Sequence, residues 1–251
     1  MRRTVLQFVT TLLLVVAGFA PVSAAEFTDP QKREIEQIVR EYLLANPSVL
    51  MEVSDALQKK QEAEQAAKAS AGLIGNAERI LRSPADYVAG NPNGDVTIVE
   101  FFDYNCPYCK RAVPVIDALL AKDKKIRLVM KEFPILGNES QFASRAAVAS
   151  ISQGKYWQFH TAMMANEGRG NNASVMALAK DVGLDTAKLE VDMKSASVEA
   201  IINSTYELAN KLAINGTPAF IVGDKLIPGA VELSQLEQEI ARVRQSGCAI
   251  C

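Results

Sequence analysis

The pattern of apolar and polar positions predicts strands at the two ends of one domain and helices between them. Residues 96–102 form an almost continuous apolar, β-branched run, which is typical of a buried strand. Residues 126–133 alternate and predict a second strand, and residues 219–222 and 225–227 predict an antiparallel hairpin. Residues 138–203 show only helical spacing. The expected fold class is therefore α/β, with a helical insertion inside a sheet domain.

The remaining elements complete a domain over residues 76–245. A helix should follow the first strand and reach about Ala121, so this strand–helix–strand unit predicts parallel strands. Residues 76–95 predict a short helix at 77–82 followed by turns. A helix from residue 204 to 212 should precede the hairpin, and residues 233–244 predict a terminal amphipathic helix. Residues 246–251 form a short tail.

Residues 26–75 show an apolar stripe of their own. Asp29 and Pro30 predict a helix start, with Asp29 as the N-cap. Steps of four and three residues then define the stripe, which consists of Val39, Leu43, Asn46, Leu50, Val53 and Leu57. A polar stretch, 58–69, follows and suits a stalk. The stripe could pack on its own domain, but the stalk favours self-association through residues 27–70 as a dimer or trimer.

Residues 1–25 resemble a secretory signal peptide. Arg2 and Arg3 precede an apolar core at 8–20, and small residues precede a cut expected after Ala24 or Ala25. An uncleaved membrane anchor is the alternative, although the apolar core is short for a span. Export would place the cysteines where disulfides persist.

Composition excludes some functions. The chain has 251 residues and a formal net charge of −2, so no bulk basic field argues for a nucleic-acid partner. No phosphate-binding loop is present, and no cofactor is expected.

The strongest chemical motif follows the first strand. Cys106-Pro107-Tyr108-Cys109 opens the predicted helix, and Pro107 suits its first turn. A thiol at a helix N-terminus faces unpaired N–H groups and the positive end of the helix dipole, and both favour the reactive thiolate. Cys106 is thus the expected exposed attacking sulfur, and Cys109 can resolve the resulting mixed disulfide.

A structural zinc site is the alternative for this motif. It needs a further ligand pair nearby. The chain has one histidine, His160, and its other cysteines are Cys248 and Cys251 at the far end. Redox chemistry is therefore favoured and no metal site is predicted. His160 itself is interpreted as a packing or surface residue.

The order of these elements resembles the DsbA-like thiol–disulfide oxidoreductases over residues 76–245. The motifs that carry the resemblance are F-F-D-Y before C-P-Y-C, and T-P-A-F before the hairpin. The segment Y-L-L-A-N-P at 42–47 resembles the ScsC (suppressor of copper sensitivity) branch. The resemblance implies a thioredoxin fold with a helical insertion, a periplasmic location, secreted clients with disulfides, a membrane-bound redox partner and isomerase activity in the oligomer.

The resemblance also implies roles for single residues. Cys106 becomes the nucleophile, Cys109 the resolving thiol and Pro218 the cis-proline beside them, with Thr217 before it. Glu100 matches a buried acid that exchanges protons with Cys109. A plain turn at Thr217-Pro218 and a solvated, edge-facing Glu100 are the alternatives.

The dipeptide between the cysteines departs from the family pattern. It is Pro107-Tyr108, whereas the strongly oxidising DsbA has Pro-His. Because tyrosine supplies no positive charge to the thiolate, we expect a less oxidising couple than that of DsbA. A redox titration giving a potential as high as that of DsbA would contradict this.

Two questions stay open at this level. Cys248 and Cys251 could be a second redox pair on a flexible tail, a Cu(I)-binding thiolate pair, or an inert disulfide. The function favoured is an oligomeric disulfide isomerase or reductase, with a monomeric dithiol oxidase as runner-up. A copper-binding or copper-carrying protein is the alternative of another class.

Overall fold

The computed structural model describes residues 27–251, and the predicted signal peptide with its cleavage site lies outside these residues. The described chain divides into two units, one ending at Lys59 and one running from Lys60 to Cys251. Each is described by itself. No helix among the described residues is long and apolar enough to cross a membrane.

The first unit is built from two helices. Helix α1 (Asp29–Ala45) begins one residue earlier than predicted, because Thr28 rather than Asp29 occupies the N-cap position. Gln31 Oε1 accepts a hydrogen bond from the Thr28 N–H at 2.9 Å and so satisfies that end of the helix. The helix α2 (Ser48–Gly75) begins after the break at Asn46-Pro47 and continues into the second unit. No residue of α1 is buried.

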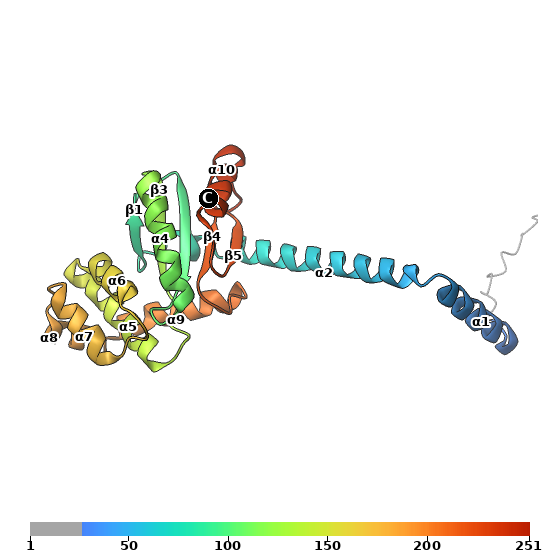
Figure 1. The fold of residues 1–251 in the computed structure, drawn as a ribbon, viewed down its shortest axis with the longest axis horizontal. Coiled ribbons are helices and arrows are strands. Elements are labelled where there is room, and N and C mark those ends of the chain that lie inside the picture. The colour runs from blue at the N-terminus through green and yellow to red at the C-terminus, as the bar shows by residue number, and fades with distance from the viewer. Residues whose placement is uncertain (1–26) are drawn as a thin grey trace, which may run out of the picture. The chain divides into compact units, whose positions relative to one another are not determined.

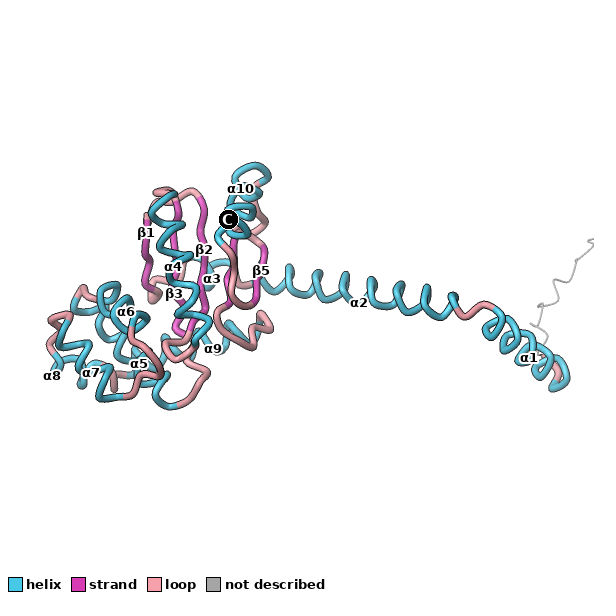
Figure 2. The backbone as a smooth tube through the Cα atoms, viewed as in Figure 1, coloured by secondary structure: helices cyan, strands magenta, loops and turns pink. Residues whose placement is uncertain are grey.

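The second unit is a five-stranded mixed sheet with helices on both faces. The strands are β1 (Tyr87–Gly90), β2 (Val96–Phe102), β3 (Ile126–Glu132), β4 (Ala219–Val222) and β5 (Lys225–Pro228). Their order is β1-β3-β2-β4-β5, with β2 and β3 parallel and the other pairs antiparallel. Figure 2 shows the strands in magenta, with helices α5–α8 gathered outside the sheet. The predicted parallel unit and hairpin are both confirmed.

The helices of this unit follow the predicted order (Figure 1). They are α3 (Ala77–Leu81), α4 (Pro107–Lys122), α5 (Asn138–Ser150), the short 3₁₀ helix η1 (Ile151–Gln153), α6 (Tyr156–Ala165), α7 (Asn172–Asp181), α8 (Thr186–Asp192), α9 (Ala196–Lys211) and α10 (Leu233–Ser246). The predicted start of α9 at residue 204 is wrong. Ser195 caps the helix through the Val198 N–H, so α9 runs unbroken through position 203, where the insertion was expected to end.

Strand β1 was not predicted. The interval 76–95 was expected to hold only a short helix and turns, because four residues are too few to show an alternating pattern. The strand forms because the outer edge of β3 offers unpaired backbone groups, and Val88 pairs there with Val129. Local sequence does not carry this information.

Alternate residues of β2 and β3 separate two apolar cores. One core joins Ile98, Phe102 and Leu128 to α4, α6 and α10. The other joins Val99, Phe101, Val129 and other residues to α3, α9 and Leu73 of α2. Burial on both faces explains why these strands read as continuous apolar runs. It also places the charged side chains of Glu100, Lys131 and Glu132 in the protein interior.

Candidate active site

The turn between β2 and α4 presents the Cys106-Pro107-Tyr108-Cys109 motif. Cys106 is the N-cap residue of α4 and Pro107 occupies its first turn, as predicted. Asp103 fixes the turn, because its Oδ1 accepts hydrogen bonds from the Asn105 N–H at 2.7 Å and from Ser140 Oγ at 2.8 Å. The thiol is thereby held at the positive end of a helix.

The predicted exposure of Cys106 is wrong. The residue is only 4% exposed, because the loop before β4 packs over it. The Cys106 Sγ lies 3.2 Å from the carbonyl oxygen of Thr217, and the Thr217–Pro218 peptide bond is cis. An attacking Cys106 must therefore meet a substrate disulfide at this narrow edge of the sheet rather than on an open surface.

The two thiols have opposite electrostatic environments. Hydrogen bonding from the Cys109 thiol lowers the pKa of Cys106 to about 5, and Thr217 and the N–H groups of Cys109 and Tyr108 act in the same direction. Cys109 is fully buried, and burial raises its pKa, assisted by its hydrogen bond to Cys106 and by the charge of Glu100. This asymmetry favours Cys106 as the nucleophile and keeps Cys109 protonated until a base acts on it.

Glu100 lies in the middle of the sheet. It is 5% exposed on the central strand β2, beside Met130 of β3 and Phe220 of β4. The alternative of a solvated, edge-facing acid is therefore excluded. Burial, followed by the charge of Cys106, raises its pKa to about 8, and its carboxyl makes no hydrogen bond to a described residue. A proton acceptor of this kind suits exchange with Cys109.

Tyr108 is the exposed member of the motif. Its side chain is 54% exposed, and the guanidinium carbon of Arg111 lies 4.3 Å from its ring centroid. Such stacking is a cation–π contact. The structure thus places the positive charge of Arg111 beside Tyr108, which has no charge of its own.

The sequence missed a buried polar network behind the motif. Glu132, at the end of β3, accepts hydrogen bonds through one oxygen from Tyr156 Oη at 2.7 Å and from Tyr104 Oη at 3.0 Å. Tyr104 Oη also lies 3.1 Å from His160 Nδ1. His160 is buried, which agrees with its interpretation as a packing residue, but it also has a hydrogen-bond partner in Tyr104. Glu100 was identified from the sequence because it is an acid within an apolar strand. The same criterion would have identified Glu132, which ends the apolar strand β3.

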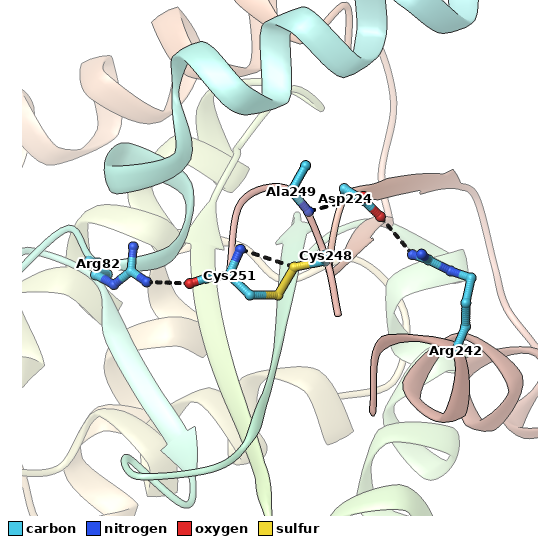
Figure 3. The surroundings of a disulfide bond; sticks show 6 residues. All are labelled: Arg82, Asp224, Arg242, Cys248, Ala249 and Cys251. Atoms are coloured by element: carbon cyan, nitrogen blue, oxygen red, sulfur yellow. Dashed lines mark hydrogen bonds and ion pairs between the residues drawn. A yellow bond between two sulfur atoms is a disulfide. The ribbon is translucent and has the colours of Figure 1, made fainter. Parts of the chain in front are cut away.

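The tail is anchored, which argues against the alternative of a second redox pair on a flexible tail (Figure 3). Cys248 and Cys251 form a disulfide. The Ala249 N–H donates to Asp224 Oδ2 at 3.2 Å, and Arg82 Nη2 donates to the Cys251 carbonyl oxygen at 2.9 Å. Ile250 is buried between these contacts. The pair is a disulfide rather than two free thiolates ready for Cu(I).

The tail disulfide lies at the opposite end of the sheet from Cys106. It packs beside Gly223, which follows Val222, and Val222 pairs with Ile98 near the start of β2. Cys106 follows the end of that seven-residue strand, so the two cysteine pairs are separated by roughly 20 Å along the strand direction. Direct exchange between them within one molecule is excluded.

The low pKa of Cys106 predicts a pH profile for alkylation. Only the thiolate reacts, so the rate of modification by iodoacetamide in the reduced protein should rise with a midpoint near pH 5. Cys109 is fully buried and its pKa is raised, so peptide mass spectrometry of the wild-type protein can assign the modification to Cys106. A midpoint above pH 8, the range of an ordinary thiol, would contradict the environment described for Cys106.

Stability should follow the same titration. Because the folded pKa of Cys106 lies below its unfolded value, the thiolate stabilises the reduced form at neutral pH, and this contribution is lost as pH falls to about 5. The unfolding free energy of the reduced form, minus that of the oxidised form, should therefore shrink between pH 8 and pH 4.5. Urea unfolding of both forms measures this difference. A difference that grows on acidification would show the opposite sign.

Comparison with known proteins identifies the domain. Residues 97–241 match the DSBA-like thioredoxin domain model, and residues 31–64 match the model described as the copper resistance protein ScsC N-terminal domain. The fold is similar to that of a thioredoxin-like oxidoreductase from Silicibacter pomeroyi DSS-3, at 49% identity and a TM-score of 0.66, covering 67% of this chain and 98% of that one. The expected thioredoxin fold with a helical insertion is confirmed.

Two further matches extend this likeness. Proteus mirabilis ScsC in a transitional conformation is 28% identical, with a TM-score of 0.64, over 86% of this chain and 100% of that one. A Na(+)/H(+) antiporter, NhaA 3 of Salinispora tropica, is 27% identical over 195 residues, which are 72% of this chain and 30% of the antiporter. The chain thus spans 24–30% of the length of the curated relatives it matches.

Proposed function

The chain belongs to the DSBA-like thioredoxin domain family, and we propose that within this family it is an oligomeric protein-disulfide isomerase and reductase acting through Cys106 and Cys109. The observation that carries the proposal is the placement of the two thiols at the start of α4. Cys106 Sγ lies 3.2 Å from the Thr217 carbonyl oxygen and Cys109 is fully buried, and these surroundings shift the two pKa values in opposite directions. A stable thiolate beside a protonated thiol is the arrangement that thiol–disulfide exchange requires.

The exchange steps follow from the positions of these groups. The Cys106 thiolate attacks one sulfur of a client disulfide, and the other client sulfur leaves as a thiolate. That thiolate can attack a second disulfide of the client and finally release Cys106, which rearranges bonds without net oxidation. Alternatively, Cys109 gives its proton to the Glu100 carboxylate and attacks Cys106 Sγ. The client leaves reduced, and Cys106 and Cys109 become a disulfide.

Client recognition is assigned to the edge formed by Thr217 and Pro218. The Thr217 carbonyl oxygen lies beside the Cys106 sulfur, so an extended client segment bound there would present its disulfide to the nucleophile. Pro107 and Tyr108 border the same sulfur in the motif. The half-exposed ring of Tyr108, stacked with Arg111, supplies an apolar contact for the client.

Self-association is supported by the uncovered stripe of the first unit. Leu50, Val53 and Leu57 are each more than half exposed in the single chain. Residues 31–64 also match the N-terminal domain model of ScsC. We propose that the stripe binds the same stripe of a second copy of this chain. Apolar residues spaced alternately four and three positions apart on a helix pack against the same pattern on a partner helix. Several active sites would then surround one client.

Location is part of the proposal. The signal-peptide pattern of residues 1–25 and the disulfide at Cys248 and Cys251 both support export to the periplasm. An isomerase there must be kept reduced, so a membrane-bound thiol–disulfide partner is expected to return two electrons to the Cys106–Cys109 disulfide. Secreted proteins with disulfides are the proposed clients.

Reactivation of scrambled, fully oxidised ribonuclease by the reduced mature chain tests the proposal. Recovery of ribonuclease activity supports isomerase function. If the chain fails to reactivate scrambled ribonuclease yet, when oxidised, converts reduced ribonuclease to the active form, it is a dithiol oxidase. Failure in both assays, with tight Cu(I) binding by the reduced chain, would replace the proposal with a copper carrier.

The tail disulfide is expected to be inert in these assays. The double variant Cys248→Ser/Cys251→Ser should exchange thiols at the wild-type rate, because the pair lies at the far end of β2 from Cys106. Its affinity for Cu(I) should also be unchanged. A large loss of exchange activity, with unchanged secondary structure by circular dichroism, would give the second pair a redox role.

A further inference from the structure

Two buried acids, Glu100 and Glu132, occupy the same face of the sheet, and His160 of α6 lies between them. Glu100 and Glu132 are on alternate positions of neighbouring parallel strands, facing α4 and α6. His160 meets Glu132 through the hydroxyl of Tyr104, with Tyr104 Oη 3.0 Å from Glu132 Oε1 and 3.1 Å from His160 Nδ1. None of the exchange steps above uses His160.

A small cavity is lined by both His160 and Glu100. Met130 and Trp157 also line it, together with the exposed residues Asp117 and Thr161. The cavity offers about 10 Å³ to the centre of a water molecule, which is room for one water. Glu100 is 5% exposed and makes no hydrogen bond to a described residue. A buried carboxyl that opens into a cavity of this size calls for a water partner.

The hydrogen bonds determine which nitrogen of His160 carries the proton. Glu132 Oε1 accepts from Tyr156 at 2.7 Å and from Tyr104 at 3.0 Å, so the single hydroxyl proton of Tyr104 points to Glu132. The contact between Tyr104 and His160 then requires Nδ1–H to donate to the tyrosine oxygen. Burial lowers the pKa of His160 to about 3, so the ring is neutral at pH 7 and its Nε2 has a free lone pair.

We propose that His160 is a positioning residue for Glu100: Tyr104 holds the imidazole as the Nδ1–H tautomer, and Nε2 accepts a hydrogen bond from the protonated Glu100 carboxyl through one water in the cavity. This inference rests on the proposed role of Glu100 as proton acceptor for Cys109. The bond favours the protonated acid, so Glu100 is a stronger base toward the Cys109 thiol and keeps that proton until Cys109 is reduced again.

Other charged and titratable groups face the same carboxyl and must be considered. They are Cys106 and Cys109 from the active-site turn, Tyr104 beside it, Asp117 from α4 and His160 from α6. Glu132 of β3 lies on the same face, burial raises its pKa to about 8, and it meets His160 only through Tyr104. The neighbouring positions on β3 and β4 carry only Met130 and Phe220. Among these groups only Asp117 and His160 line the cavity together with Glu100, and of the two only His160 is buried.

The test uses the fact that His160 is the chain's only histidine. Untagged mature protein labelled with ¹⁵N-histidine gives a single imidazole, and long-range ¹H–¹⁵N spectra report its tautomer and charge directly. In wild type we expect a neutral ring protonated at Nδ1, with an Nε2 shift that titrates near pH 8 as Glu100 ionises. That titration should vanish in Glu100→Gln. An Nε2–H tautomer in wild type overturns the proposal without any variant.

A matched pair of variants separates this role from simple packing. Tyr104→Phe and Tyr156→Phe each remove one hydroxyl from Glu132, but only the Tyr104 hydroxyl also hydrogen-bonds His160. The Tyr156 ring is stacked on the imidazole, and phenylalanine keeps that contact. In Tyr104→Phe the ring is free to become Nε2–H and donate to the Glu100 carboxylate, so the Glu100 midpoint should fall by roughly one pH unit. Tyr156→Phe should keep the wild-type tautomer and midpoint. Equal behaviour of the two variants contradicts the proposal.

Kinetics provide an independent check. The pH midpoint for resolution of a Cys106 mixed disulfide by Cys109 should move to lower pH in Tyr104→Phe and stay in place in Tyr156→Phe. Because the spectra need no client, the two proposals can fail separately. A correct tautomer with no thiol exchange contradicts the proposed function alone, whereas normal exchange with the wrong tautomer contradicts the role of His160 alone.

Discussion

Replacing Cys106 with serine is expected to abolish disulfide exchange and isomerisation, reducing the reactivation of scrambled ribonuclease to the uncatalysed rate. A serine hydroxyl cannot form the mixed disulfide on which both reactions depend. Cys109 cannot take over the role, because it is fully buried and burial keeps its pKa high. The loss should therefore be complete rather than partial, at every pH at which the protein is folded.

The companion variant distinguishes the two cysteines. Cys109→Ser should still attack client disulfides but should accumulate the mixed disulfide, visible as a covalent adduct on a non-reducing gel. The double serine variant of the tail is the control, since it makes the same cysteine-to-serine change at two positions far from α4. Appreciable reactivation by Cys106→Ser would show that the nucleophile has been misassigned.

The second large effect is expected from a charge in the apolar stripe. Val53→Asp should convert the oligomer to a monomer and abolish reactivation of scrambled ribonuclease, while the oxidised variant should still oxidise reduced ribonuclease. Val53 is 58% exposed in the single chain and would be buried in the proposed assembly. Burying an unpaired carboxylate there costs about 3–5 kcal/mol. Sedimentation velocity measures the assembly.

The adjacent position supplies the control. Ser54 is exposed and lies off the stripe, so Ser54→Asp adds the same charge and should leave both assembly and isomerase activity intact. A shortened chain that lacks the first unit should start at Lys60 rather than at residue 76. Leu73 is 3% exposed and packs in the same core as Leu212, so it must be kept. If Val53→Asp stays oligomeric, or is monomeric but fully active as an isomerase, the proposed link between assembly and function is wrong.

Local sequence was sufficient for features whose energetics are local. The position of Cys106 at a helix N-terminus follows from an apolar strand, a short turn and a proline in the first helical turn, all adjacent in the chain. The parallel strands follow from the order strand, helix, strand, and the hairpin follows from two short apolar runs joined by a tight turn. Glu100 was identified as a candidate site residue because burying a charged side chain costs free energy in any buried strand, whatever packs against it.

Tertiary structure decided the features that depend on distant segments. The burial of Cys106 comes from Thr217, which lies 111 positions further along the chain, and the docking of the tail needs Arg82 and Asp224. The edge strand β1 exists because β3 has a free edge, and no pattern in four residues records that.

The network behind the active site gives the sharpest contrast. From the sequence, His160 was a lone helical histidine without a visible partner. The fold places it against Tyr104, and through that hydroxyl it meets Glu132 of β3. Spacing along one helix or strand determines which face a side chain occupies, whereas a hydrogen bond across layers depends on how helices pack on a sheet. That packing is a property of the whole chain, so only the tertiary structure could reveal these partners.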